Sequence, residues 1–170
     1  MQTNTKTVFY STFITGILIA GTLDVTAAIV VYGYLANAQA FKILHSIASV
    51  LIGPSAFTGG WGTALLGLAI HFFIAACFTL LFIRLYNRSS WLRHNKTIGG
   101  LAYGSLVWCI MNLIVLPVFQ HKMAHFTVES IAIGMAILMC CIGLPLAYIT
   151  DYHVRKSITG EASSVHQKLA

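Results

Sequence analysis

The chain has 170 residues, of which 58% are hydrophobic and only 8% are charged, and its formal net charge is +6. Soluble domains of this length have about a quarter of their residues charged, so the composition excludes an ordinary soluble domain and indicates a protein of the lipid bilayer. The basic residues lie in tails and loops, not on a large polar face with interleaved aromatic side chains, so we expect no nucleic-acid partner.

Four apolar runs are long enough for helices that cross a hydrocarbon core of about 30 Å, which takes about 20 residues. They lie at about 9–35, 61–86, 98–119 and 127–150. Because these runs leave little other chain, we expect one all-α transmembrane domain over residues 1–156, an integral membrane four-helix bundle. Residues 157–170 are predicted to form a disordered cytoplasmic tail.

The first run carries a carboxylate, Asp24, in its middle. A charge at that depth costs about 2.5–3.5 kcal/mol on insertion scales, so an intramembrane carboxylate usually has a partner and a function. Gly16 and Ala20 form a small-xxx-small pair on the same helical stripe, which predicts that this face points into the bundle. The run is also too long for a signal peptide, so we expect it to remain as a span.

Residues 38–52 are predicted to form a short amphipathic helix in the first outer loop. Lys42 and His45 fall largely on its polar side. The apolar side follows helical spacing at Phe41, Leu44, Ile47, Ala48 and Leu51. About fifteen residues are too few to span comfortably, so we expect an interfacial or re-entrant helix. The pair Gly53-Pro54 ends it, because proline disfavours a helical residue before it.

A histidine in the second run is the candidate partner of Asp24. Asp24 lies ten residues before Tyr34, and His71 lies ten residues after Trp61. In an antiparallel hairpin both would lie roughly 15 Å below the same surface, at a rise of about 1.5 Å per residue. Such a pair would exchange a proton near neutral pH. The alternative is an interhelical hydrogen bond that only stabilises the bundle.

The third and fourth runs add further candidate residues. Asn112 lies about seven residues from the outer end of the third run and is the third predicted pocket residue, with Asp24 and His71. His45 and Glu129 are predicted to line the pocket mouth. Pro117 is expected to kink or stop the third helix. In the fourth, Pro145 removes the usual donor to the Cys141 carbonyl.

A separate pattern in the third loop raises the alternative of a metal site. His121, His125 and Glu129 have the spacing i, i+4, i+8, so one helix would present all three on a single face. His45 would be the fourth ligand, and imidazole with carboxylate suits zinc, iron or copper. The other interpretation is that these are polar residues at the membrane interface, in which case no cofactor is expected.

The basic residues predict the orientation in the membrane. Eight lie in the amino tail, the second loop or the carboxyl tail: Lys6, Arg84, Arg88, Arg93, Lys96, Arg155, Lys156 and Lys168. Only Lys42 and Lys122 lie in the first and third loops. By the positive-inside rule, both termini are predicted to be cytoplasmic.

Three short stretches resemble a known group of proteins. They are Leu-Gly-Leu-Ala-Ile-His-Phe at 66–72, Gly-Gly-Leu-Ala-Tyr-Gly at 99–104 and Leu-Pro at 116–117. Together they resemble uncharacterised bacterial inner-membrane proteins of the YagU type. The resemblance implies a four-helix protein of the bacterial inner membrane with a histidine in its second span, and it implies no catalytic residues. Those proteins tend to have a histidine near the position of Asn112.

No nucleophile, base or phosphate-binding spacing is visible, so the sequence predicts no enzyme. The leading hypothesis is a small transporter or channel-like protein for a proton, an ion or a small polar solute, working as a homo-oligomer. The first alternative is an accessory or scaffold subunit, whose glycine faces pack against a larger membrane complex. The second alternative is a membrane metal-binding or redox protein.

Overall fold

The computed structural model describes residues 3–35, 39–120 and 127–169, and within these ranges the chain is all α-helical, without a strand. The first half comprises α1 (Thr3–Leu35), α2 (Ala40–Ile52), the 3-10 helix η1 (Gly53–Thr58), α3 (Gly60–Arg88) and α4 (Ser90–His94). The second half comprises α5 (Lys96–Ile110), η2 (Met111–Val115), α6 (Leu116–Gln120), α7 (Val128–Leu138), η3 (Met139–Gly143) and α8 (Leu144–Leu169). The segments η2 and η3 are wide, π-helical turns.

Five described helical stretches are long and apolar enough to cross a membrane, one more than the sequence predicts. Four of them, Lys6–Tyr34, Gly60–Arg88, Lys96–Phe119 and Val128–Ser157, match the predicted spans. The fifth, Ala40–Thr58, consists of the 13-residue α2 followed directly by the short 3-10 helix η1. The α-helical part alone is about 20 Å long, which is short of the hydrocarbon thickness.

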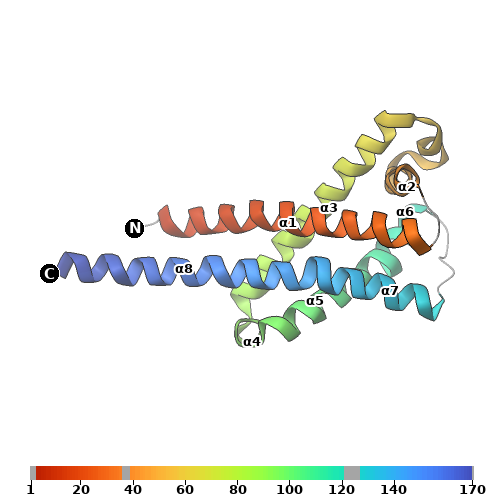
Figure 1. Cartoon of the computed structure of the whole chain (residues 1–170). Helices are drawn as coiled ribbons and strands as arrows, with labels where there is room; N and C mark the ends of the chain where they lie inside the picture. Colours follow the sequence, from red (N-terminus) through yellow and green to blue (C-terminus); the bar gives the residue numbers. More distant parts are fainter. Residues whose placement is uncertain (1–2, 36–38, 121–126, 170) are drawn as a thin grey trace.

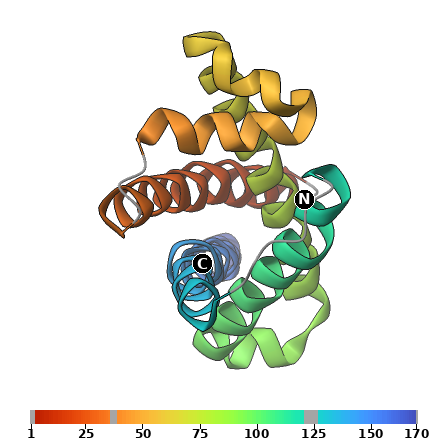
Figure 2. The ribbon, with the colours of Figure 1, turned by 90° about the vertical axis from the view of Figure 1, so that its right-hand side faces the viewer.

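The direction of α2 agrees with an interfacial helix. Figure 1 shows α2 end-on, while α1 and the continuous α7–α8 rod are seen from the side. In Figure 2, turned by 90°, α2 is seen lengthwise and the α7–α8 rod end-on. The short helix therefore runs across one end of the bundle, so the structure is a bundle of four long helical segments with a short amphipathic helix.

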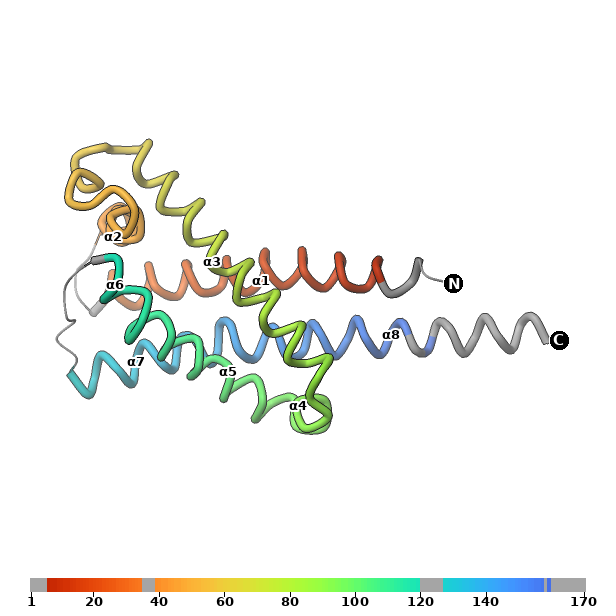
Figure 3. The backbone as a smooth tube through the Cα atoms, turned by 180° about the vertical axis from the view of Figure 1, so that it is seen from behind, coloured from red at the N-terminus to blue at the C-terminus, as the bar shows by residue number. Residues whose placement is uncertain are grey.

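The long segments pack as an antiparallel bundle. Helix α1 lies beside α8 and runs in the opposite direction, and α3 crosses α1 obliquely, as the view from behind shows (Figure 3). Both chain termini and α4 lie toward one end, opposite to α2 (Figure 1). The basic residues of the helix ends around α4 therefore share their end of the bundle with the termini.

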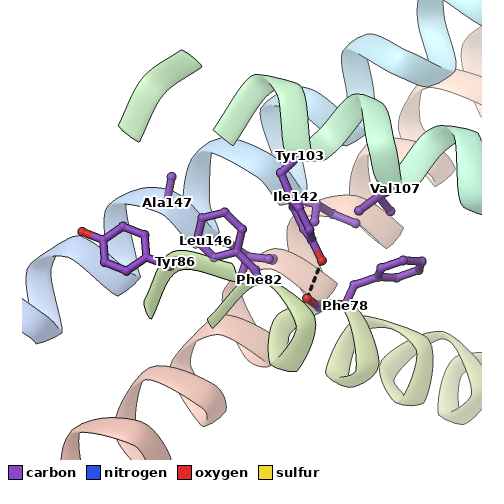
Figure 4. Packing of buried hydrophobic residues seen from close by; sticks show 9 residues of the cluster. Phe78, Phe82, Tyr86, Tyr103, Val107, Ile142, Leu146 and Ala147 are labelled. Carbon is purple, nitrogen blue, oxygen red and sulfur yellow. Dashed lines mark hydrogen bonds between the residues drawn. The ribbon is translucent and has the colours of Figure 1, made fainter. Parts of the chain in front are cut away.

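The apolar core lies in the half of the bundle that contains α4. Its buried members come from α1, α3, α5, η3 and α8: Ala20, Phe78, Phe82, Tyr86, Tyr103, Val107, Ile142, Leu146 and Ala147 (Figure 4). The rings of Phe82 and Tyr103 meet edge to face, with centroids 4.9 Å apart. The Tyr103 hydroxyl donates to the Phe78 carbonyl at 2.6 Å, so the buried phenol keeps a partner.

Glycine allows α5 and η3 to cross at backbone contact. A Cβ at Gly100 would lie 2.8 Å from the Gly143 carbonyl oxygen, and a Cβ at Gly143 would overlap the backbone of Gly100. Gly104 packs equally closely on Met139 and Leu138. Gly100 and Gly104, which form a small-xxx-small pair, thus allow close packing between the third and fourth spans of the same chain.

The two wide turns share a sequence pattern that is not apparent from the distribution of hydrophobic residues. η2 is followed by Leu116-Pro117 and η3 by Leu144-Pro145, so each belongs to a Met-x-x-Ile-x-Leu-Pro segment. Proline has no N–H and cannot complete the regular ladder of the preceding turn. A π-bulge is one known way to accommodate such a break. The irregularities predicted at Pro117 and Pro145 therefore take the form of widened turns, and the helices continue beyond them.

One difference concerns the end of the chain. The sequence predicts a disordered tail over residues 157–170, whereas α8 is helical as far as Leu169. The stretch contains no proline, and Gly160 is its only glycine, so little in it prevents the helix from continuing.

Candidate substrate cavity

A cavity of about 500 Å³ lies in the half of the bundle covered by α2. It is bounded by α1, α2, α3 and the η2–α6 segment, with these lining residues: Asp24, Val25, Ala28, Tyr32, Lys42, Ile43, Ser46, Ile47, Val50, His71, Ile74, Met111, Val115 and Leu116. The lining of α1 begins at Asp24 and continues two turns toward the end of that helix. The cavity thus extends from beneath α2 to the depth of Asp24.

The structure brings Asp24 and His71 to this one cavity. His71 does not bond to the carboxylate; its Nε2 atom lies 2.9 Å from the carbonyl oxygen of Gly21, one turn before Asp24. A carbonyl only accepts, so Nε2 carries the hydrogen and donates it. Nδ1 is then the ring atom that can gain or lose a proton. The two side chains are close enough to interact electrostatically.

The oxygens of the Asp24 carboxylate remain available to accept hydrogen bonds. Among the described residues we find no hydrogen bond to it. Tyr32, two turns further along α1, and Cys141, in η3, lie within electrostatic range of the carboxylate. Asp24 is eleven residues before the end of α1 at Leu35, which places it about 16 Å along the helix from that end. The acid is therefore deep in the bundle and faces the cavity.

Lys42 and Ser46 also line the cavity, from α2, and the sequence analysis did not assign them to the site. Their i, i+4 spacing on the polar side of the amphipathic helix is the signal that could have found them. Sequence periodicity shows that α2 has a polar side, but it does not show which neighbour that side covers. Lys42 is exposed, so its ammonium group reaches the surface at the α2 end.

Helix α2 is fixed firmly to α3. At Gly67 the two helices cross so closely that a Cβ would overlap the Leu44 carbonyl. The ring of Phe41 packs edge to face on Trp61, with centroids 4.4 Å apart. His45 is buried, and its Nε2 donates to the Gly60 carbonyl at 2.9 Å. His45 thus holds α2 to the start of α3, and it is not among the residues that line the cavity.

Asn112 is not among the lining residues either. Its amide donates to the carbonyl of Trp108 at 3.0 Å, one turn back on its own helix. Its neighbours Met111 and Val115 line the cavity instead. The prediction used only the depth of Asn112 below the outer end of the helix, and depth does not decide which face carries a side chain, here within the wide turn η2.

Glu129, the other predicted mouth residue, is exposed in the first turn of α7. It lies within a capping box, between Thr127 and Ser130, which bond reciprocally, and it is not part of the cavity lining. An acidic residue in a first turn is favoured by the helix dipole, which accounts for its position without a ligand.

The predicted metal ligands are only partly described. His121 and His125 lie outside the described residues, so the set His45, His121, His125 and Glu129 stays a prediction. His45 already uses Nε2 on the Gly60 carbonyl. Within the described ranges, no group of three or more His, Cys, Asp or Glu side chains is placed to hold a metal ion.

A second charged cluster lies at the opposite end of the bundle. The buried Asp151 accepts from Lys96 at 2.7 Å, from Arg155 at 2.9 and 3.0 Å, and from the Tyr86 hydroxyl at 3.0 Å. It ties together α3, α5 and α8. The i, i+4 spacing of Asp151 and Arg155 was a sequence signal for part of it. Because both oxygens of this carboxylate already accept hydrogen bonds within the chain, we assign the cluster a role in stabilising the fold and not in binding a ligand.

Comparisons of the chain with protein-family models, with curated proteins and with solved structures return no match. The resemblance to YagU-type proteins stays a prediction.

Proposed function

We propose that the chain is a small multi-pass membrane transporter that binds a solute or proton in the cavity beneath α2. Asp24 is the binding carboxylate, and His71 exchanges a proton with it through Nδ1. The observation that carries this proposal is that an intramembrane carboxylate and an imidazole line one cavity, at the depth where α1 and α3 pass each other. Intramembrane ionisable residues generally mark ion or solute paths.

The hydrogen bonds favour a functional pair over a purely structural one. A structural pair would join the imidazole directly to the carboxylate. Here His71 satisfies its donor on the Gly21 carbonyl, which leaves the Asp24 oxygens open to a ligand. The bond to the Gly21 backbone also orients the imidazole ring relative to α1, the helix that carries Asp24.

The membrane orientation forms part of the same proposal. We infer that both termini are cytoplasmic, because the end that carries the termini also carries the helix ends around α4 with Arg84, Arg88, Arg93 and Lys96. The bacterial inner-membrane location that we propose rests on the resemblance to YagU-type proteins. The cavity then lies in the outer half. A bundle this narrow would transport as a homo-oligomer.

The accessory-subunit alternative receives less support. It assumed that glycine faces remain free for a larger complex, whereas Gly16 packs on Thr79 and Leu146, and Gly100 packs on Gly143. These close contacts are formed inside the chain. The metal-binding alternative rests on His121 and His125, which lie outside the described residues.

Proton uptake into vesicles containing the purified protein tests the proposal. An internal pH-sensitive dye reports uptake when a potassium diffusion potential, negative inside, is imposed with valinomycin. We expect uptake above that of protein-free vesicles, reduced to that background by Asp24→Asn. The matched control is Glu129→Gln, which removes an exposed carboxylate outside the cavity and should leave uptake unchanged. Equal uptake by wild type and folded Asp24→Asn would refute the proposal.

A further inference from the structure

We propose that the ligand of the cavity is a small lipophilic amine, bound with its ammonium group on Asp24 and its apolar body beneath α2. The inference rests on the proposed function for the location of the site and adds the chemical class of the ligand. It follows from the charge at the inner end of the cavity, from the composition of its walls and from its size.

The inner end of the cavity selects for a cationic donor. The Asp24 carboxylate lines it and has no hydrogen bond among the described residues. A protonated amine supplies several N–H donors and an opposite charge, and charge-assisted bonds of this kind are roughly twice as strong as neutral ones. An anionic headgroup would meet repulsion at the same place. The His71 imidazole has no Nε2–H to offer an anion, since that donor is used on Gly21.

The walls of the cavity select for an apolar body. Nine of the fourteen lining residues are apolar: Val25, Ala28, Ile43, Ile47, Val50, Ile74, Met111, Val115 and Leu116. A fully hydrated inorganic cation would leave these side chains without a partner. An alkyl or aromatic amine would cover them, and each buried methylene raises affinity by about fourfold. The volume of about 500 Å³ lies within the range of small-molecule sites.

Lys42 sets the orientation of the ligand. Its ammonium lies at the α2 end and is exposed, so it repels a cationic group at the mouth and favours the headgroup at the inner end. Because Lys42 remains solvated, it does not provide a buried partner for a carboxylate of the ligand. We therefore assign the site to a simple amine and not to a zwitterion.

The test is a binding measurement on the purified protein in detergent, without any transport step. Isothermal titration with n-hexylamine, n-hexanol and n-hexanoate compares one chain length with three headgroups. Each titration is repeated on Asp24→Asn in the same micelles, so that partition into detergent cancels. We expect saturable hexylamine binding that weakens at least tenfold in Asp24→Asn and returns in Asp24→Glu. Hexanol should show no difference between wild type and variant, and hexanoate should bind no more weakly to Asp24→Asn than to wild type, because the variant removes the repelling charge.

A second pair of variants tests the cavity with Asp24 intact. Ile47→Trp fills the space under α2 and should abolish hexylamine binding, whereas Leu51→Trp, at an exposed position of the same helix, should not. Lys42→Gln should strengthen binding by about twofold, because it removes repulsion at the mouth.

The outcomes separate this inference from the proposed function. Hexanol or hexanoate binding as tightly as hexylamine, or hexylamine binding that is unaffected by Ile47→Trp, would overturn the amine assignment, even if proton uptake depended on Asp24. Selective hexylamine binding together with proton uptake that does not depend on Asp24 would retain the amine site and reject proton transport through Asp24.

Discussion

The Nε2 atom of His71 bonds to the Gly21 carbonyl at 2.9 Å, one helical turn away from the carboxylate that shares its cavity. The imidazole is thus anchored to the backbone of α1 through one of its two ring nitrogens. This arrangement lets His71 hold α1 to α3 through one nitrogen, while the proton transfer that we propose for it would use the other.

Substitution at His71 should separate these roles. We expect His71→Ala to lower the free energy of unfolding by about 0.6–2 kcal/mol, the usual range for an interhelical hydrogen bond in a membrane protein. His71→Gln can keep a donor to the Gly21 carbonyl, so it should recover most of the stability but not the proton uptake. Unfolding by SDS in mixed micelles gives the first quantity, and the vesicle assay gives the second. Equal uptake by His71→Gln and wild type would leave His71 with a structural role alone.

The crossing of α2 and α3 at Gly67 gives a second prediction. Gly67→Ala places a Cβ against the Leu44 carbonyl, so α2 must move away from α3. We expect a loss of about 1–3 kcal/mol in the free energy of unfolding, as for overpacking elsewhere. Gly62→Ala, also in α3, is the matched control, since a Cβ there meets no atom within 4 Å. Similar losses in both variants would mean that the crossing is not the cause.

The Asp151 cluster should stabilise the end of the bundle without affecting the cavity. Asp151→Asn leaves the Tyr86 hydroxyl and two cations with a weaker partner, and we expect a loss of about 1–3 kcal/mol in unfolding free energy. Arg155→Ala should cost less, because the Arg155 side chain is exposed and solvent screens its charge. Proton uptake per folded protein should remain that of wild type. Reduced uptake at unchanged folded content would show that this end takes part in transport.

The proline after η2 should control the shape of the cavity wall. Pro117→Ala restores a backbone N–H, which favours a regular helix through residues 111–115 and turns Met111 and Val115 away from their present positions. We expect unchanged or higher stability together with weaker hexylamine binding. Amide hydrogen exchange should show a protected N–H at position 117. Binding equal to wild type with that amide protected would separate the wide turn from the cavity.

The larger features of the fold follow from the length and polarity of the apolar runs. Residues 61–86 and 98–119 are long and apolar enough for helices that cross a bilayer, whereas the 13-residue amphipathic helix is too short to do so comfortably. The depth shared by Asp24 and His71 also follows, because a regular helix turns residue counts into height. These inferences use only the constant rise of the helix.

For residues near irregular turns, the sequence does not predict which face of the helix carries the side chain. Asn112 was placed by its depth alone, and depth does not say which face of the helix, irregular here at η2, carries its side chain. The sequence signal lies in the repeated Met-x-x-Ile-x-Leu-Pro segments, whose common backbone form is visible only in the structure. Lys42 and Ser46 were missed for a related reason, because the amphipathic pattern of α2 does not say which neighbours its polar side meets.

The attachment of α2 to α3 has a consequence for biogenesis. The contacts that fix α2, at Leu44–Gly67, His45–Gly60 and Phe41–Trp61, are all made with residues that follow it in the chain. During synthesis these three contacts therefore cannot form until the second long helix has left the ribosome and entered the membrane. Helix α2, which covers the cavity, is therefore fixed in place later than its position in the chain implies. Until α3 is inserted, Asp24 lies in the membrane without the helix that carries His71.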